Sequence, residues 1–329
     1  MPRTIRWEPP RTPFTRAHVA PLGVSPAMIR DAHRTGRITR LAHGVFIATD
    51  AVADDSGARH LQSALAHQTL RPTAIASHHT AALAWGLDLD DPEASAAAPP
   101  TFIQPTGRNS RSQSVGDIRV SVRDLPPGHR VAHPCGLLVT TPARAAVDVV
   151  AGLRLPEALI TLDSAARLAL VEMVGSRRLR EHYTNPRSLA AARSALLESA
   201  EHAATQFTRR SLCELVALAD PRRETALESY SFGQFMLAGL PLPEMQVRIS
   251  TLAGDVYPDF LWRDQMVIGE ADGLIKYDSP GALRAEKVRQ EDLEQLGYRV
   301  VRWATPEIRS RALVVVARIA SAIDARSGF

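Results

Sequence analysis

The stretch of residues 256–303 constrains the fold of this chain more than any other part. It begins with two apolar runs separated by a polar turn at residues 264–265, a pattern that predicts a β-hairpin. A turn at this point pairs Asp259 with Glu270, and directly opposed residues have Cβ atoms about 5 Å apart on one face of the sheet. Asp272 lies two residues beyond Glu270 and shares that face. Acids gathered on an apolar hairpin are costly unless something positive is held there, so the hairpin predicts a cation.

The elements around the hairpin follow a recognisable order. Before it, we expect a helix that Asp220 caps with Pro221 in its first turn, and then a strand at residues 245–252. After it, we expect a long helix that starts at Ser279-Pro280 and a buried strand at residues 298–303. The predicted order of the core is therefore α-β-β-β-α-β.

This order resembles the PD-(D/E)xK nuclease fold, and more closely the branch related to very-short-patch repair endonucleases. The matching motifs are Glu-Ser (228–229), Gly-Leu-Pro-Leu-Pro (239–243) with Gln246, Tyr-Pro-Asp-Phe-Leu-Trp (257–262), Gly-Glu-Ala-Asp-Gly (269–273) and Leu-Gly-Tyr-Arg-Val-Val-Arg-Trp (296–303). The resemblance covers nearly the whole last third of the chain. It implies a restriction-endonuclease-like core that hydrolyses phosphodiester bonds in DNA.

The resemblance also implies a magnesium site, with Mn²⁺ as an alternative metal. Mg²⁺ takes hard oxygen ligands and keeps several waters, and it can activate one of them for attack on a phosphodiester. Asp259 is expected to be the bridging ligand, Glu270 the second ligand and the carbonyl of Ala271 the third. Glu228 matches the acid that the fold places on its first helix to hold a metal or its waters, and Glu224 is the alternative.

One position departs from the family pattern. Lysine is expected at position 272, where this chain has Asp272, and its only lysines are Lys276 and Lys287. Lys276 from the following loop or Lys287 from the next helix could steady the attacking water; otherwise Asp272 joins the metal cluster. The alternative to an active nuclease is a degenerate nuclease fold that is retained for binding.

The other end of the chain is basic. The whole chain of 329 residues has a formal net charge of only +4, but arginines are concentrated in the first fifty residues. We expect a short helix at residues 15–22, a second helix capped by Ser25 with Pro26 at its first position, and a hairpin around His43-Gly44. Helix, turn, helix and hairpin form a winged helix-turn-helix, which docks on duplex DNA. Its expected DNA-binding residues are Arg30, His33, Arg34, Arg37, Arg40 and His43. A winged helix used only for protein contacts is the alternative.

The first half of the chain resembles the AbiEi-type antitoxin family. The matching segments are Leu-Gly-Val-Ser (22–25), Arg-Ile-Thr-Arg-Leu-Ala-His-Gly-Val-Phe (37–46), Ile-Ala-Ser-His-His-Thr-Ala-Ala-Leu-Ala-Trp-Gly-Leu (75–87) and Thr-Pro-Ala-Arg-Ala-Ala-Val-Asp-Val-Val (141–150). The resemblance implies a winged helix that binds operator DNA and represses its own operon, and a cognate toxin or defence protein as partner. His78 and His79 are adjacent on a predicted helix and point in different directions, so we expect capping or core hydrogen bonds there and no metal site.

These patterns predict an α/β multidomain protein with a mobile arm at residues 1–13, the winged helix-turn-helix at 14–52, a mixed α/β middle domain at 53–215 and the nuclease-like domain at 216–329. The first residues lack a signal-peptide apolar run, and Cys135 and Cys213 lie far apart. We therefore expect a cytoplasmic, nucleoid-associated protein with no membrane partner. The predicted function is DNA binding coupled to a metal-dependent endonuclease, in a defence or toxin–antitoxin context. The alternative is a non-enzymatic transcriptional repressor or antitoxin.

Overall fold

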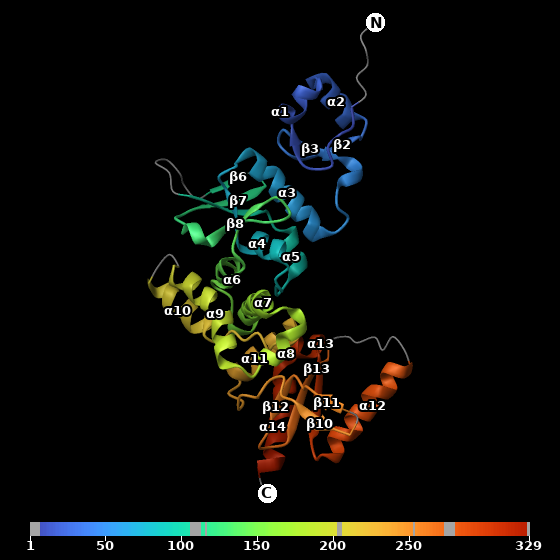
Figure 1. Ribbon diagram of the computed structural model, residues 1–329, viewed down its shortest axis with the longest axis vertical. Helices are drawn as coiled ribbons and strands as arrows, with labels where there is room; N and C mark the ends of the chain where they lie inside the picture. Colours follow the sequence, from blue (N-terminus) through green and yellow to red (C-terminus); the bar gives the residue numbers. More distant parts are fainter. Residues whose placement is uncertain are drawn as a thin grey trace. The chain divides into compact units, whose positions relative to one another are not determined.

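The structure is a computed structural model that describes residues 7–105, 113–115, 117–202, 206–252, 254–272 and 280–327. The chain is a mixed α/β protein that divides into two compact units, residues 1–149 and 150–329 (Figure 1). The second unit includes helices that the sequence assigns to the middle domain. The predicted boundary between residues 215 and 216 stays a prediction.

The first unit begins with short helices and a three-stranded sheet of order β1-β3-β2. The elements are β1 (Phe14–Thr15), α1 (Arg16–Val19), η1 (Ala20–Leu22), α2 (Pro26–Arg34), β2 (Ile38–Ala42) and β3 (Val45–Ala48). The predicted helix start is confirmed, because the side chain of Ser25 accepts a hydrogen bond from the backbone N–H of Met28. Gly44 has a φ of 74°, which allows the tight turn between β2 and β3.

A small core holds this first segment together. Trp7 is buried and packs edge-on against Phe14, with ring centroids 6.0 Å apart. The backbone carbonyl of Trp7 accepts a hydrogen bond from Arg37, and the carbonyl of Pro10 accepts one from the N–H of Ala48. The sequence predicts a mobile arm through residue 13, whereas the chain is anchored from Trp7 onward. The burial of Trp7, an aromatic residue inside the Pro- and Arg-rich segment, accounts for the difference.

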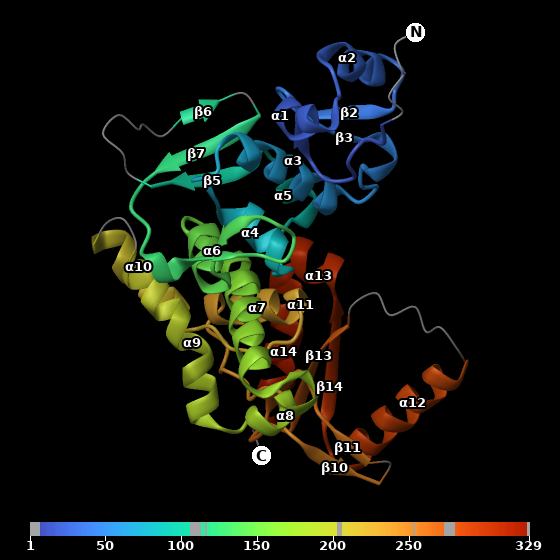
Figure 2. The same cartoon turned by 45° about the horizontal axis from the view of Figure 1, so that its top comes forward.

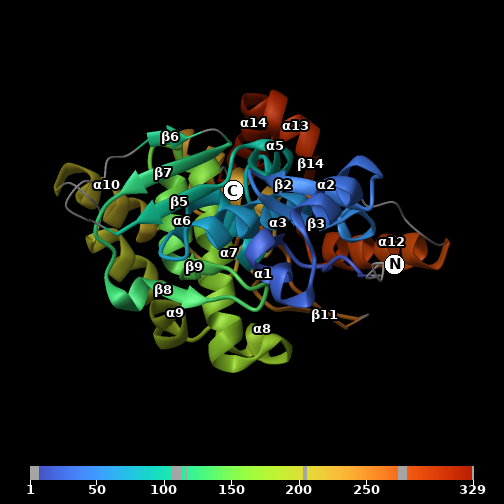
Figure 3. The same cartoon turned by 90° about the horizontal axis from the view of Figure 1, so that it is seen from above.

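A mixed six-stranded sheet of order β6-β7-β5-β4-β9-β8 follows in the first unit. Figure 3 shows β6, β7 and β5 side by side, and α4 packs against β5. The strands are β4 (Ile75–Ala76), β5 (Thr101–Gln104), β6 (Gln113–Val115), β7 (Ile118–Val122), β8 (Arg130–Ala132) and β9 (Leu138–Thr140). The helices are α3 (Ser56–Leu70), α4 (His78–Trp85), α5 (Pro92–Ala97) and α6 (Pro142–Val150), with the short turns η2 (Thr49–Ala51) and η3 (Pro127–His129).

The second unit opens with a group of helices around α7 (Leu155–Val174). The others are η4 (Ser176–Arg178), α8 (Leu179–His182), α9 (Pro186–Glu201), α10 (Gln206–Val216) and α11 (Ala226–Leu237). Helix α7 is buried along most of its length and packs against α9 and α11. The α7–α11 contact is close, because a Cβ atom added to Gly233 would lie 2.5 Å from the Cα of Pro156.

The sheet of the second unit carries the acids that the sequence singled out. It has the order β12-β13-β14, with β12 (Phe260–Trp262), β13 (Val267–Asp272) and β14 (Arg299–Ala304). The predicted hairpin register is confirmed: Phe260 pairs with Gly269 and Trp262 with Val267, so Asp259 falls opposite Glu270. Strand β14 runs parallel to β13 and pairs Glu270 with Arg302.

The remaining elements of the second unit surround this sheet. They are β10 (Ile249–Thr251) and β11 (Gly254–Val256), which form a separate pair, and α12 (Pro280–Gln295), α13 (Thr305–Ser310) and α14 (Ala312–Ser327). Helix α14 packs against β13 and β14 (Figure 2). Among the described residues, no helix has the length and apolar character that a membrane span needs.

Candidate nucleic-acid interface and carboxylate cluster

The predicted DNA-binding residues lie on α2 and on the β2–β3 hairpin, and all are exposed. They are Arg30, His33 and Arg34 on α2, Arg37 before β2, Arg40 on β2, and His43 in the turn. The apolar side of α2, with Ile29 and Ala32, is buried in the small core. The local fold thus directs the basic side chains outward from one helix and one hairpin.

These side chains differ in how strongly the fold holds them. Arg37 donates to the carbonyl of Trp7 at 2.7 Å and lies over the Trp7 ring, so it helps to anchor the first residues. A ring nitrogen of His33 lies 3.2 Å from the carbonyl of Ile38. Arg34 forms an exposed ion pair with Asp31. An exposed pair of this kind contributes little to stability, so Arg34 can exchange its partner for a phosphate at small cost.

The predicted acids of the second unit gather at one end of β12 and β13. Asp259 precedes β12, and its Oδ2 accepts a hydrogen bond of 2.8 Å from the backbone N–H of Ala271. Glu270 is buried on β13, and its Oε1 has no hydrogen-bond partner among the described residues. Asp272 ends β13 and lies 3.6 Å from Arg302. The structure therefore brings Asp259, Glu270 and Asp272 together, as the hairpin pairing predicts.

The electrostatics of this cluster show the cost of grouping acids. Burial, and next the charge of Asp259, raise the pKa of Glu270 to about 8. The same two causes raise the pKa of Glu228 to about 8. Burial raises the pKa of Asp259 to about 6, against the hydrogen bond from Ala271 and the charge of Arg289. Glu228 and Glu270 thus both respond to the charge of Asp259, and each of the three carboxyls holds its proton to a higher pH than in water.

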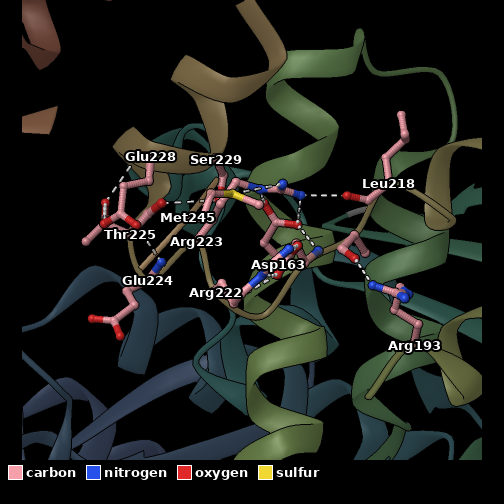
Figure 4. Close-up of polar contacts among 12 residues, drawn as sticks. Asp163, Arg193, Leu218, Arg222, Arg223, Glu224, Thr225, Glu228, Ser229 and Met245 are labelled. Atoms are coloured by element: carbon pink, nitrogen blue, oxygen red, sulfur yellow. Dashed lines mark hydrogen bonds and ion pairs between the residues drawn. The ribbon is translucent and has the colours of Figure 1, made fainter. Parts of the chain in front are cut away.

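Glu228 also has a structural task. It lies in the first turn of α11, where its two carboxylate oxygens accept from the N–H of Glu224 and the hydroxyl of Thr225 (Figure 4). Thr225 in turn accepts from the N–H of Glu228, so the two residues cap the helix reciprocally. Glu224, the alternative ligand, is more exposed and accepts from the hydroxyl of Tyr183.

Arginines supply the positive charge near the acids in the described part of the chain. Nη1 of Arg289 on α12 lies 3.5 Å from Oε1 of Glu270. The two groups form an ion pair, but they do not form a hydrogen bond. Arg302 on β14 lies beside Glu270 through the strand register. Neither arginine is predicted from the sequence, although a parallel pairing of residues 298–303 with the hairpin would indicate Arg302. Lys276 and the side chain of Lys287 lie outside the described residues.

The chemistry of the cluster suits a magnesium ion only in part. Carboxylate oxygens are the right donors, and a buried Glu270 oxygen without a hydrogen-bond partner leaves one lone pair available. However, no group of three or more acids, histidines or cysteines among the described residues is placed to hold a metal. Carboxylate oxygens of Asp259 and Glu228 already accept hydrogen bonds from backbone N–H groups. Asp259 and Glu270 thus remain as two candidate ligands, and the magnesium ion stays a proposal.

A buried ion pair positions α11 and was not predicted from the sequence. Asp163 on α7 accepts from Nη2 of Arg223 at 2.7 Å and from the N–H of Asp220 at 2.8 Å (Figure 4). Both side chains are fully buried, and Arg223 also donates to the carbonyl of Leu218. This pair fixes the loop before α11. The predicted helix start at Asp220 is therefore wrong, and α11 begins at Ala226.

The paired histidines of the first unit make hydrogen bonds, as predicted. His78 contacts Ser77 at 3.0 Å, and a ring nitrogen of His79 lies 3.3 Å from the carbonyl of Pro99. Burial lowers the pKa of His79 to about 4, so this ring is neutral at pH 7. Next to His78, Arg123 and Arg144 both donate to Oδ1 of the buried Asp148.

Comparisons with known protein families match two segments in the N-terminal part of the chain. Residues 12–49 match the family model described as "Transcriptional regulator, AbiEi antitoxin". Residues 74–199 match the model described as "AbiEi antitoxin C-terminal domain". AbiEi antitoxin family domains thus account for the N-terminal part of the chain, and the resemblance that the sequence indicated is confirmed there. Neither match reaches the carboxylate cluster.

Two curated relatives come from Mycobacterium tuberculosis. They are the uncharacterized protein MT2308 of strain CDC 1551 / Oshkosh and the uncharacterized protein Rv2248 of strain ATCC 25618 / H37Rv. Each is 32% identical over 201 residues, which cover 60% of this chain and 66% of the relative. Among solved structures, the RV2827C protein from Mycobacterium tuberculosis aligns over 73% of this chain and 83% of that one, at 16% identity and a TM-score of 0.36.

Proposed function

We propose that this chain is a DNA-binding transcriptional regulator of the antitoxin type, in which residues 14–52 form a winged helix-turn-helix. The observation that carries the proposal is the exposed basic face of α2 beside an exposed basic hairpin. A helix of this kind fits the major groove, and the hairpin then reaches the neighbouring backbone. The family model over residues 12–49 supports the same function.

The roles of the basic residues follow from how they are held. Arg30, Arg34, Arg40 and His43 project from the surface and are expected to contact phosphates or base edges. Arg37 is held by Trp7 and is expected to orient the first residues as well as to contact the backbone of DNA. A cognate toxin is the expected protein partner, in keeping with the antitoxin family.

DNA binding can be tested with the duplex that lies upstream of the protein's own gene and with a scrambled duplex of equal length. Wild type should bind the upstream duplex more tightly and with a steep dependence on salt. Each lost phosphate contact should lower the slope of log K against log salt by about 0.9. Equal affinity for both duplexes, together with a flat salt dependence, would refute a role as a DNA-binding regulator.

A second function, Mg²⁺-dependent DNA hydrolysis by the second unit, is favoured by one observation. Asp259 and Glu270 oppose each other on a buried hairpin, and both have a raised pKa, because burial outweighs the charge of Arg289. We propose these two as metal ligands, with Glu228 and the carbonyl of Ala271 as further candidates. A bound Mg²⁺ would polarise a phosphoryl oxygen and lower the pKa of its water. A nuclease-like fold used only for binding is the competing proposal.

Magnesium binding and DNA cleavage should be measured separately. Isothermal titration with MgCl₂ should show binding to wild type and none to an Asp259→Ala/Glu270→Ala variant. Plasmid incubated with Mg²⁺, with Mn²⁺ or with EDTA then reports cleavage. Cleavage that survives the double substitution would exclude this site, whereas metal binding without cleavage would support the degenerate fold.

A further inference from the structure

The third strand of the second unit's sheet, β14, is an edge strand in the described part of the chain. It pairs with β13 on one side only. The N–H of Arg299 donates to the carbonyl of Met266. This bond shows which residues of β14 direct their backbone groups toward β13, because the direction alternates from one residue to the next. Arg299, Val301 and Trp303 therefore direct their backbone groups toward β13, and Val300 and Arg302 direct theirs away from the sheet.

The outward groups of β14 are only partly satisfied. The carbonyl of Arg302 accepts a hydrogen bond of 3.1 Å from Nη2 of Arg318 on α14. The outward N–H and C=O of Val300 form no hydrogen bond with another described residue. Edge strands of this kind are the usual templates for pairing with another chain.

A groove of about 670 Å³ lies along this edge. Its walls are residues 299–302 of β14 and the residues Leu313, Val314, Ala317, Arg318 and Ser321 of α14. Leu313 is 80% exposed and Val314 is 50% exposed. The opposite side of α14, with Val315, Ile319 and Ala322, is buried in the core that includes β13 and β14 residues. Helix α14 thus presents apolar side chains beyond the last strand of the sheet.

The charges of the groove are all positive. Arg299, Arg302 and Arg318 line it, and no acid does. Arg302 is compensated by Asp272 at 3.6 Å and Arg318 by Glu307 at 2.9 Å. Arg299 is exposed and forms no ion pair with another described residue. An occupant that carries negative charge is therefore favoured.

We propose that this groove binds an acidic, extended segment of a partner protein, which adds to β14 as a fourth strand. The backbone of Val300 supplies a donor and an acceptor, α14 supplies an apolar floor, and the arginines select for acids. A second copy of this chain is disfavoured, because two paired β14 strands would bring arginines against arginines. Duplex DNA is disfavoured because its phosphates give the exposed apolar side chains of Leu313 and Val314 no apolar partner. The proposal does not depend on DNA binding or on nuclease activity.

The test uses the full-length protein and three labelled peptides. The first is Asp-Val-Glu-Val-Asp-Val, the second is its charge-reversed counterpart Lys-Val-Arg-Val-Lys-Val, and the third is the acidic peptide with alternate amides N-methylated. Affinity is measured by fluorescence anisotropy, and hydrogen exchange is followed at the amide of Val300. We expect the acidic peptide to bind and to slow exchange at this amide, and the charge-reversed peptide to bind more than about tenfold more weakly.

Variants locate the binding to the groove. Leu313→Asp should weaken binding of the acidic peptide more than about tenfold, since it places a carboxylate on the floor of the groove. Leu252→Asp changes a leucine of the same unit that is 93% exposed and lies outside the groove, and it should have no effect.

Several results would overturn the proposal. These are no binding of the acidic peptide at millimolar concentration, equal binding of the charge-reversed or N-methylated peptide, and unchanged exchange at Val300. Protection of Val300 that rises with protein concentration in the absence of peptide would identify a second copy as the occupant. Protection by duplex DNA alone would assign the groove to nucleic acid.

Discussion

At the residue scale, the buried carboxyl of Glu270 allows the most direct measurement of the electrostatics of the second unit. Its carboxyl is buried on β13, close to Asp259, and the charges of Arg289 and Arg302 compensate it only in part. The sequence placed Glu270 correctly, because hairpin register follows from the turn between two short strands. It could not reveal Arg289, because that contact joins a helix and a strand across the fold.

The raised pKa of Glu270 predicts how stability depends on pH. The folded-state pKa, about 8, lies above the usual value of 4.5, so the folded state holds the proton more tightly. This contribution to stability is fully present below pH 4.5 and is lost as the pH rises through 8. Urea unfolding in EDTA should show a larger loss of stability between pH 5 and pH 8.5 for wild type than for Glu270→Gln. Glu172→Gln, an exposed change on α7, should behave as wild type; a Glu270→Gln profile that follows wild type would contradict the prediction.

The buried pair of Asp163 and Arg223 predicts a large effect of a single substitution. Asp163→Ala would leave the guanidinium of Arg223 buried without its partner, which should lower the free energy of unfolding by about 3–5 kcal/mol. Denaturant titration measures this loss. Glu181→Ala removes the acid of an exposed pair with Arg178 and should cost less than about 1 kcal/mol. Equal losses in the two variants would show that the buried pair is not needed.

At the scale of elements, a local sequence signal predicts a helix start correctly only where no long-range contact overrides it. Ser25-Pro26 begins α2 as expected, because capping involves residues a few positions apart. Asp220-Pro221 gives the same signal, but no helix begins there. The N–H of Asp220 is held by Asp163, and its carboxylate is held by Arg222, so neither is available for a cap. Trp7 likewise lies in a segment whose composition predicts mobility, and its burial depends on a core made by later residues.

The close contact between α7 and α11 gives a prediction at this scale. Gly233→Ala would place a Cβ atom 2.5 Å from the backbone of Pro156, so the two helices must separate. We expect a loss of about 1–3 kcal/mol in the free energy of unfolding. Gly128→Ala is the matched control, because no atom lies within 4 Å of the added Cβ. A Gly233→Ala protein as stable as the Gly128→Ala protein would show that the helices can move apart freely.

At the scale of the whole molecule, the two units carry different kinds of evidence. The family model over residues 12–49 and an exposed basic face support a DNA-binding regulator in the first unit. The second unit has the hairpin register and the grouped acids that the sequence predicted, without a three-ligand metal set among its described residues. The sequence predicted the N-terminal family resemblance and the hairpin acids, since each has its own local motif. The arginines that compensate the acids depend on the folded chain and were not predicted.

DNA binding through α2 and the β2–β3 hairpin is the central claim, and its most direct test is the salt dependence of affinity for the upstream duplex. Wild type, Arg34→Ala, Arg40→Ala and the control Arg178→Ala should be compared by fluorescence anisotropy over a series of salt concentrations. We predict that Arg34→Ala and Arg40→Ala each weaken binding and each lower the log–log slope by about 0.9, since each removes one phosphate contact. Arg178→Ala, an exposed arginine of the second unit, should leave both quantities unchanged. Affinity and slope that stay at the wild-type values in Arg34→Ala and Arg40→Ala would contradict the claim.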